Sequence, residues 1–198
     1  MDSKRIFDIL LALFGLIVLS PVFVIISILI LLDSKGGIFY RQIRVGKNVE
    51  DFPMLKFRTM YVHQHDQLLL TLGNHDVRIT KLGYWLRKYK LDELPQLFNV
   101  LKGHMSFVGP RPEVRKYVNL YNDEQIMVLS VKPGITDLAS IEFSNECELL
   151  AKSNDPENFY IKELIPLKIN QNMKYIKNND LWIDLKIIYL TINKIILS

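Results

Sequence analysis

The sequence is poor in cysteine and lacks the glycine and histidine motifs of the common nucleotide and metal sites. Its single cysteine, Cys147, excludes a disulfide within the chain, and nothing indicates an oxidising compartment. No Walker-type or dinucleotide-type glycine loop is present. The four histidines, His63, His65, His75 and His104, have neither the spacing of a helical zinc motif nor a cysteine partner. We therefore expect neither a zinc site nor a nucleotide-binding loop of those classes.

Long basic runs are also absent, although the formal net charge is +4. No cluster of basic residues is interleaved with aromatic residues, as binding to nucleic acid would favour. Positive charge instead flanks one apolar block, at Lys4, Arg5, Lys35, Arg41, Arg44 and Lys47. This position favours lipid headgroups and phosphate-bearing substrates as partners, and no nucleic acid is expected.

The apolar block covers residues 9–32, which carry no charged side chain. A straight helix of that length, about 36 Å, would cross a hydrocarbon core of about 30 Å. Ser20 and Pro21 interrupt it, because proline cannot donate to the carbonyl four residues back and serine can bond a freed carbonyl. A kinked span and a re-entrant hairpin both fit this pattern. A signal peptide is disfavoured, because the apolar run is long and no cleavage pattern follows it.

Asp8 lies where the chain would enter the membrane, one helical turn after Lys4 and Arg5. Side chains three or four residues apart are neighbours on a helix. We therefore expect Asp8 to pair with Lys4 or Arg5, and the alternative is a solvated first turn.

The remainder of the chain indicates an α+β fold. Residues 38–42 and 52–57, on either side of a Gly-Lys-Asn turn, predict a β-hairpin and hence a small sheet. Apolar residues at helical spacing predict short helices over residues 82–89, 93–101, 114–121 and 160–179, the last interrupted at Pro166. For residues 181–197 we expect an amphipathic helix at the membrane interface, with a buried core helix as the alternative. The predicted units are a membrane element over 1–34 and a membrane-associated domain over 35–198.

Asp92 and Glu93 place adjacent carboxylates at the start of one of these helices. The ordinary explanation is that acids in a first turn complement the helix dipole. Because Arg87 and Lys88 lie just upstream, a chemical explanation also stands. Adjacent side chains on a helix point about 100° apart, so one carboxylate could attack a substrate while the other holds a cation or a proton.

Basic residues elsewhere are candidates for binding a phosphorylated substrate. Pro110 and Pro112 restrict the backbone around Arg111, whose guanidinium suits a phosphate or a planar base. The alternative is an ordinary proline-rich turn with an arginine facing solvent. Lys56 and Arg58 would share one side of a strand, where they would meet a diphosphate or simply solvent.

Taken together, these motifs resemble the bacterial sugar transferases known as small monotopic phosphoglycosyl transferases. Each motif alone is weak, but their order and spacing are specific, and the match runs to about Thr136 and resumes near Tyr175. The segments that carry it are Lys4-Arg5-x-x-Asp8, Ser20-Pro21, and residues 56–60, 91–103, 105–112 and 132–136.

The resemblance implies a re-entrant, non-spanning helix broken at Ser20-Pro21, followed by amphipathic interfacial helices. It places the active site at the cytoplasmic face of the bacterial inner membrane. It also implies a reaction in which Asp92 attacks the sugar-linked phosphate of a UDP-sugar and expels UMP. Undecaprenyl phosphate would then attack the phosphosugar–aspartyl intermediate. Mg²⁺ near Asp92 and Glu93, Arg87 on the phosphates and Arg111 on the nucleotide would offset the negative charge.

Two departures from the family pattern limit what the resemblance implies. His104 stands where the family usually has an acid, and residues 137–143 replace its common continuation after Thr136. The second departure leaves the sugar of the donor open. Two other hypotheses also stand: a non-enzymatic, membrane-anchored binding or assembly module of the same fold, and a lipid-surface protein that uses only its basic flanks. Whether the protein works as a monomer or a homodimer is also open.

Overall fold

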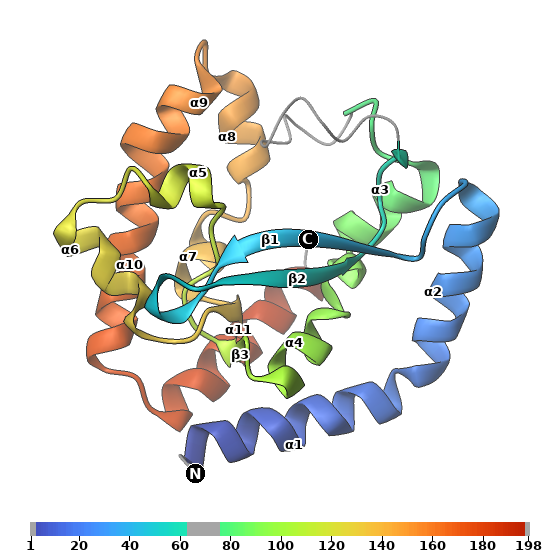
Figure 1. Ribbon diagram of the computed structural model, residues 1–198, viewed down its shortest axis with the longest axis horizontal. Helices are drawn as coiled ribbons and strands as arrows, with labels where there is room; N and C mark the ends of the chain where they lie inside the picture. Colours follow the sequence, from blue (N-terminus) through green and yellow to red (C-terminus); the bar gives the residue numbers. More distant parts are fainter. Residues whose placement is uncertain (1–2, 63–75, 197–198) are drawn as a thin grey trace.

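The computed structural model describes residues 3–62 and 76–196, in which helices surround two small two-stranded sheets (Figure 1). The strands are β1 Phe39–Val45, β2 Asp51–Phe57, β3 Ser106–Val108 and β4 Gly134–Thr136. The α-helices are α1 Ser3–Val18, α2 Ser20–Asp33, α3 Lys81–Lys88, α4 Gln96–Lys102, α5 Arg115–Val118, α6 Asp123–Ile126, α7 Leu138–Glu142, α8 Glu146–Lys152, α9 Pro156–Phe159, α10 Ile165–Lys177 and α11 Leu181–Ile196. The 3₁₀ turns η1 Lys47–Val49, η3 Leu91–Glu93 and η4 Met127–Ser130 and the π-turn η5 Tyr160–Leu164 complete the described elements. The predicted α+β class is confirmed.

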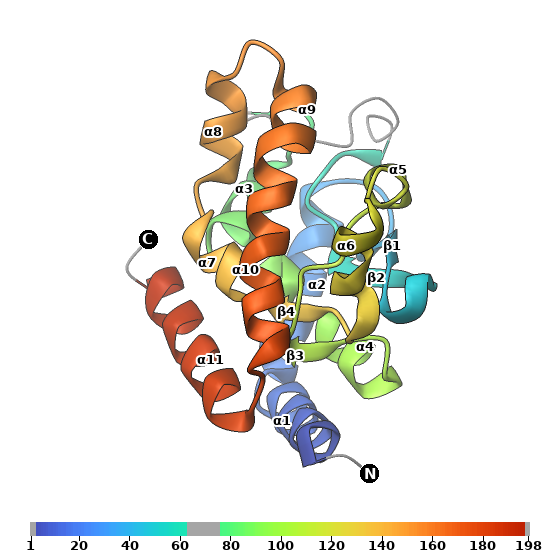
Figure 2. The same ribbon diagram turned by 90° about the vertical axis from the view of Figure 1, so that its left-hand side faces the viewer.

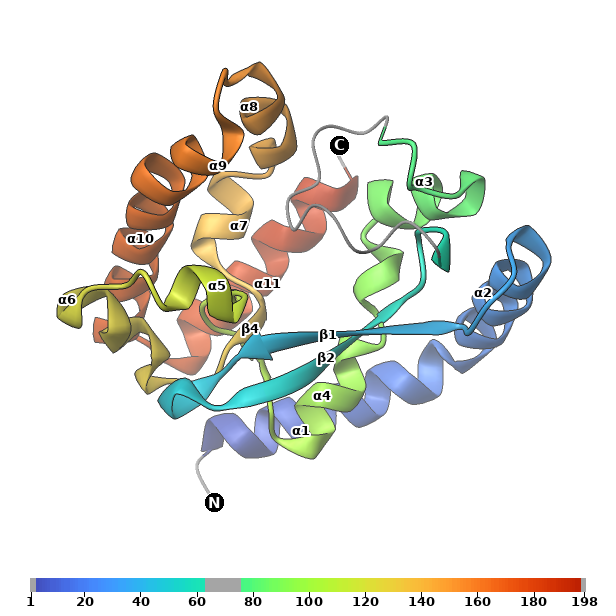
Figure 3. The same ribbon diagram turned by 45° about the horizontal axis from the view of Figure 1, so that its top comes forward.

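The predicted hairpin is confirmed, with a longer first strand than the sequence indicated. β1 and β2 pair antiparallel, with Phe39 opposite Phe57 and Val45 opposite Asp51. Phe52 and Met54 of β2 pack with α1 and α4, whereas Phe57 packs with α2 and α3. The hairpin therefore joins two hydrophobic clusters, and it crosses the molecule from the α5–α6 side to α2 (Figure 3).

The predicted break at Ser20-Pro21 is confirmed. The axes of α1 and α2 meet at 61°, Pro21 lies in the first turn of α2, and Ser20 Oγ donates to the Ile17 carbonyl at 2.8 Å. Within residues 3–62 and 76–196, no single helix is long and apolar enough to cross a bilayer. The bent pair of α1 and α2 reaches that length and apolar composition only when the two helices are taken together.

The predicted pairing of Asp8 within its own helix is wrong, and so is the alternative of a solvated turn. Asp8 is only 2% exposed, and its Oδ1 accepts hydrogen bonds from Ser106 Oγ and the Phe107 amide, both at 3.1 Å. A buried carboxylate needs donors, and β3 supplies them. Asp8 therefore attaches α1 to the sheet rather than to its neighbours in sequence.

Lys4 and Arg5 bind protein groups rather than facing outward as the predicted lipid flank. Lys4 Nζ contacts the Asp184 carboxylate and donates to the Tyr175 hydroxyl at 3.1 Å. Arg5 donates to two carbonyls at the end of α4, at 2.6 and 2.9 Å. Cations stabilise the carbonyl end of a helix. We refer to Lys4, Asp8, Tyr175 and Asp184 as the N-terminal polar cluster, because it fastens α1 to β3, α10 and α11.

The last helix, α11, has the amphipathic pattern predicted for it. Asp184 and Ile187 are buried, and the helix packs against β3 and α7 (Figure 2). Trp182 is 80% exposed, and Tyr189 lies on the exposed side as well. One face of α11 thus belongs to the core, while the opposite face carries large apolar side chains on the surface.

A parallel pair of strands, which the sequence did not indicate, holds the predicted proline–arginine loop in place. β3 pairs with β4, and the Gly134 amide donates to the Pro110 carbonyl at 3.0 Å. A Cβ on Gly109 or Gly134 would meet backbone atoms at 2.4 or 2.2 Å, so only glycine permits this approach. The pair positions the backbone directly before Arg111.

The helices predicted in the middle of the chain are confirmed in type and approximate place. α3 covers the first, η3 and α4 cover the second, and only α5 forms in the third. The long helix predicted near Pro166 divides into the π-turn η5 and α10, with Pro166 in the first turn of α10. The helical backbone continues without a break from η5 into α10, so Pro166 lies where the pairing changes from π to α.

Candidate active site

Asp92 and Glu93 lie on the tight turn η3 between α3 and α4. Lys90, just before this turn, has a left-handed backbone with φ of 56°, which reverses the chain after α3. The regular helix α4 begins only at Gln96. The two acids therefore do not lie in the first turn of α4, and they face different surroundings.

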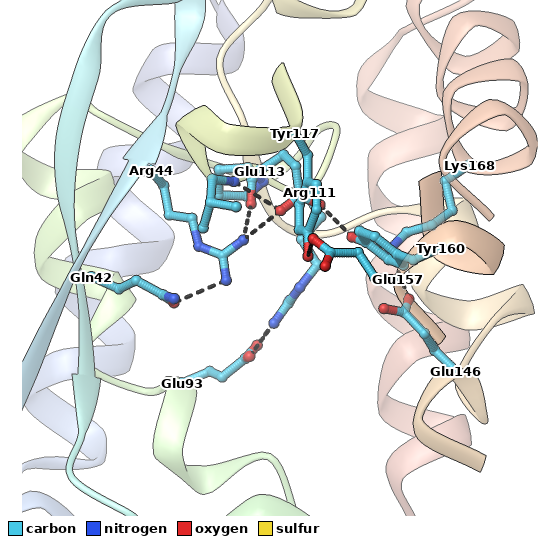
Figure 4. Close-up of polar contacts among 12 residues, drawn as sticks. Gln42, Arg44, Glu93, Arg111, Glu113, Tyr117, Glu146, Glu157, Tyr160 and Lys168 are labelled. Carbon is cyan, nitrogen blue, oxygen red and sulfur yellow. Dashed lines mark hydrogen bonds and ion pairs between the residues drawn. The ribbon is translucent and has the colours of Figure 1, made fainter. Parts of the chain in front are cut away.

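Glu93 is enclosed by two cations. Lys56 Nζ donates to Glu93 Oε1 at 2.8 Å, and Arg111 forms a two-pronged pair with both carboxylate oxygens (Figure 4). Burial alone would raise the pKa of Glu93, but the charges of Arg111 and Lys56 and the bonds from Arg111 hold it well below its usual range. Glu93 is therefore ionised, and both of its oxygens are occupied.

Asp92 is the opposite case. It is 6% exposed, and its Oδ1 is buried without a hydrogen-bond partner among the described residues. Burial raises the pKa of Asp92, and the nearby charge of Lys56 offsets this effect only in part. A buried carboxylate oxygen without a donor is costly to keep, so it is a candidate for contact with a ligand.

Most of the predicted substrate-binding residues lie beside this acid pair. Lys56, Arg87 and Arg111 line one cavity together with Pro110 and Pro112. Asp92 and Glu93 are not part of the cavity wall, but Lys56 and Arg111 contact Glu93, and the charges of Lys56 and Arg87 act on Asp92. We refer to Lys56, Asp92, Glu93 and Arg111 as the active-site cluster.

Arg58 does not join this cluster. β2 ends at Phe57, so the alternation that would place Arg58 beside Lys56 ends one residue too early. Its guanidinium donates to the Gly37 carbonyl at 2.6 Å, and to the hydroxyl and carbonyl of Ser34 at 2.8 Å each. Arg58 thus fastens the connection between α2 and β1.

The donor set for a divalent cation is small. In the described ranges, 3–62 and 76–196, no group of three or more histidine, cysteine, aspartate or glutamate side chains could hold a metal ion. Magnesium is commonly bound through one or two carboxylates together with substrate phosphates. Asp92, with an oxygen unpartnered, fits such a role, whereas the oxygens of Glu93 are occupied by Lys56 and Arg111. His63, His65 and His75 lie outside the described residues.

The opposite wall of the cavity was missed by the sequence analysis. It includes Tyr160 of η5 and, eight and twelve residues later, Lys168 and Asn172 of α10. Polar residues at this spacing share one face of a helix. That spacing was the signal in the sequence that could have revealed this wall. It was not distinctive, because polar residues with this spacing are usual on any solvated helix.

The likeness to known proteins covers nearly the whole chain. A family model described as bacterial sugar transferase matches residues 2–198. The chain belongs to the bacterial sugar transferase family. Similar proteins include the UDP-glucose:undecaprenyl-phosphate glucose-1-phosphate transferase of Klebsiella pneumoniae, which is 37% identical over 98% of this chain. The UDP-N-acetylgalactosamine-undecaprenyl-phosphate N-acetylgalactosaminephosphotransferase of Aeromonas hydrophila is 36% identical over 98%.

The relatives differ in length. The chain spans 40% of the Klebsiella protein and 43% of the Aeromonas protein. It spans 86% of the exopolysaccharide production protein ExoY of Rhizobium meliloti, to which it is 33% identical. The residues of this chain that the family model matches, 2–198, include the active-site cluster and the bent helix pair.

Proposed function

We propose that this chain transfers a sugar phosphate from a UDP-sugar to undecaprenyl phosphate, with Asp92 as the nucleophile. The observation that carries the proposal is the buried, unpartnered Oδ1 of Asp92, next to Glu93, which Lys56 and Arg111 hold. The printed names of the Klebsiella and Aeromonas relatives, which describe transfer from UDP-sugars to undecaprenyl phosphate, support the choice of substrates.

The reaction has two steps at one phosphorus atom. In the first, a carboxylate oxygen of Asp92 bonds to the phosphorus that carries the sugar, and the bond to UMP breaks. In the second, a phosphate oxygen of undecaprenyl phosphate bonds to the same phosphorus, and the Asp92 carboxylate leaves. The products are UMP and a sugar linked to undecaprenyl diphosphate. A covalent intermediate allows a water-soluble donor and a lipid acceptor to use the same site in turn.

The cations of the cavity serve the first step. Asp92 attacks as the carboxylate, a form that burial disfavours because it raises the pKa of this group. Lys56 and Arg87, whose charges favour the ionised carboxylate, oppose that effect. On the cavity wall, Arg87 would contact the phosphates and Arg111 the nucleotide, and Glu93 would hold Arg111 and Lys56 in place. Magnesium held by Asp92 and the donor phosphates would further neutralise negative charge.

We also propose that α1 and α2 form a re-entrant hairpin, with the active site at the cytoplasmic face of the bacterial inner membrane. The 61° bend and the outward apolar side chains of both helices support this arrangement. Such side chains include Leu10, Phe14, Ile17, Ile25, Ile28 and Leu32. Residues 1–34 would then be the membrane element, and residues 35–198 the membrane-associated catalytic domain.

Release of UMP tests the function. The purified chain in lipid nanodiscs would be incubated with magnesium, undecaprenyl phosphate and a panel of UDP-sugars. We expect UMP from at least one donor, and none above background from Asp92→Asn. Asp123→Asn, on the exposed start of α6, is the matched control and should retain full activity. Absence of UMP with every donor would favour the non-enzymatic module or the protein that uses only its lipid-binding surface, and UMP release by Asp92→Asn at the wild-type rate would show that Asp92 is not the nucleophile.

A further inference from the structure

The cavity that contains Arg111 continues into a chamber that the proposed chemistry does not use. The chamber is lined by Arg44 of β1, Glu113, Glu146 of α8, and Tyr160, Lys168 and Asn172 of η5 and α10. Figure 4 shows several of these side chains converging from different elements around Arg111. Glu146 is also among the charges that raise the pKa of Arg111, after that of Glu93, so the chamber lies within electrostatic reach of the active-site cluster.

Most charged groups in the chamber neutralise one another. Arg44 pairs with Glu113 at 3.0 Å, and Lys168 pairs with Glu146 at 2.7 Å. The Tyr160 hydroxyl donates to Glu113. The chamber therefore presents little net charge, and a charged ligand is not what it selects.

Two buried polar atoms of the chamber wall lack a partner among the described residues. Asn172 is 5% exposed, and its Oδ1 is an acceptor without a donor. Arg44 Nε is a donor without an acceptor. Each unpaired buried group costs free energy that a bound ligand can recover. A hydroxyl group suits both atoms, because it donates one hydrogen bond and accepts others.

The aromatic side chains of the chamber favour a hydroxyl-rich ligand over a planar base. The Tyr160 ring packs edge-on against Tyr117, with centroids 5.1 Å apart. Lys168 Nζ lies 5.1 Å from the centroid of the same Tyr160 ring. Tyr117 and Lys168 therefore already contact the Tyr160 ring, so no free ring face is left on which a planar base could stack. A ligand at Tyr160 would instead meet the polar groups around it.

We propose that this chamber binds the sugar of the donor and that Asn172 is a specificity-determining residue, whose Oδ1 accepts a hydrogen bond from a sugar hydroxyl or amide. The inference rests on the proposed function and extends it, since the sugar is bonded to the phosphate that Asp92 attacks.

Binding in a variant that cannot react tests the sugar site separately from the chemistry. In Asp92→Asn protein in nanodiscs, calorimetry would compare the affinities of UMP, UDP-glucose, UDP-galactose, UDP-N-acetylglucosamine and UDP-N-acetylgalactosamine. We expect one UDP-sugar to bind more tightly than UMP, and Asn172→Ala to weaken that UDP-sugar roughly threefold to tenfold. The affinity for UMP should stay within about twofold. Asn170→Ala, on the exposed side of the same helix, should leave both affinities unchanged.

The possible results separate the two proposals. If Asn172→Ala lowers the affinities for UMP and for the UDP-sugar equally, the chamber holds the nucleoside and the sugar site is refuted. If no UDP-sugar binds more tightly than UMP, or Asn172→Ala changes nothing, the sugar site is also refuted, while UMP release by the wild-type chain would leave the proposed function standing. If the wild-type chain releases no UMP but binding depends on Asn172 as expected, the transfer reaction fails and the sugar site stands. Should Asn172→Ala fail to fold, Asn172→Leu, which keeps the size of the side chain and removes the acceptor oxygen, replaces it, and the same outcomes decide.

Discussion

The N-terminal polar cluster and the active-site cluster are both buried groups of charged side chains, yet they are completed to different degrees. In the first, Asp184 uses both carboxylate oxygens, one on Lys4 and one on the Tyr175 hydroxyl at 2.6 Å. In the second, Glu93 is equally occupied, but Asp92 beside it keeps an unpartnered oxygen within the described part of the chain. The first cluster joins distant elements, and the second contains a buried acceptor, Asp92 Oδ1, without a donor among the described residues.

This difference shows how a structural carboxylate can be distinguished from a chemical one. Burial is common to Asp8, Asp92 and Asp184, so burial alone does not identify the nucleophile. Asp8 and Asp184 have their donors on other elements of the fold, whereas Asp92 has a raised pKa and an oxygen without a donor in residues 3–62 and 76–196. Completed hydrogen bonding indicates stability, and incomplete hydrogen bonding indicates a site.

The largest expected effect is on the rate of UMP release, when Asp92 of the active-site cluster is replaced. Asp92→Asn should lower the rate of UMP release by about 10³-fold or more, because the amide cannot form the covalent intermediate. The rate would be measured at saturating UDP-sugar with undecaprenyl phosphate present. A residual rate within tenfold of the wild type would mean that Asp92, like Asp184, takes no part in the reaction.

The second effect concerns stability rather than rate. Asp184→Ala should destabilise the folded chain by about 3 kcal/mol, because it leaves Lys4 and the Tyr175 hydroxyl without their shared acceptor. Chemical denaturation in detergent would measure the change. Asp180→Ala, at the exposed start of α11, is the control and should cost about 1 kcal/mol through the loss of a cap. An equal loss of stability in both variants would mean that the N-terminal polar cluster stabilises the fold no more than a surface helix cap does.

A smaller effect is expected at Arg111. Arg111→Lys retains the charge but loses the two-pronged pair with Glu93, so kcat/KM should fall by about tenfold. Arg115→Lys, an exposed pair with Asp51, should leave kcat/KM unchanged. Identical kinetics for the two lysine variants would show that the two-pronged pair between Arg111 and Glu93 does not matter for activity.

The smallest expected effect is a change in Tm, which has opposite signs when Asp92 and Glu93 are neutralised. The pKa of Asp92 is raised in the folded state, so stability falls as the pH rises from about 3.8 through that raised value. Asp92→Asn should therefore raise the Tm by about 2–4 °C at pH 7, and the gain should vanish below pH 4. The pKa of Glu93 is lowered, so its contribution is present above about 4.5 and is lost as the pH falls through the lowered value. Glu93→Gln should accordingly lower the Tm at pH 7, and shifts of the same sign in both variants would contradict these environments.

Much of the fold could be predicted, because it depends on local patterns. The hairpin, the break at Ser20-Pro21 and the middle helices follow from apolar spacing and turn residues. The β3–β4 pair could not be predicted in this way, since each strand has three residues and their pairing depends on a close approach at Gly109 and Gly134. Local reasoning also failed for Asp8, whose partner Ser106 lies 98 residues away.

The site was predictable to a similar extent. The structure brings Lys56, Arg87 and Arg111 around the acid pair, as the motifs suggested. Arg58 was misplaced because strand alternation holds only while the strand lasts. The chamber around Asn172 was missed because its polar residues resemble an ordinary solvated helix face until the structure buries them.

The central claim is that Asp92 accepts the phosphosugar covalently. The direct test is to incubate the wild-type chain with a UDP-sugar labelled in the phosphate next to the sugar, without undecaprenyl phosphate, and to map the labelled peptide. The account predicts label on the peptide that contains Asp92, released by hydroxylamine and absent from Asp92→Asn. If donor is consumed only when both substrates are present and no labelled peptide is recovered, the account is contradicted.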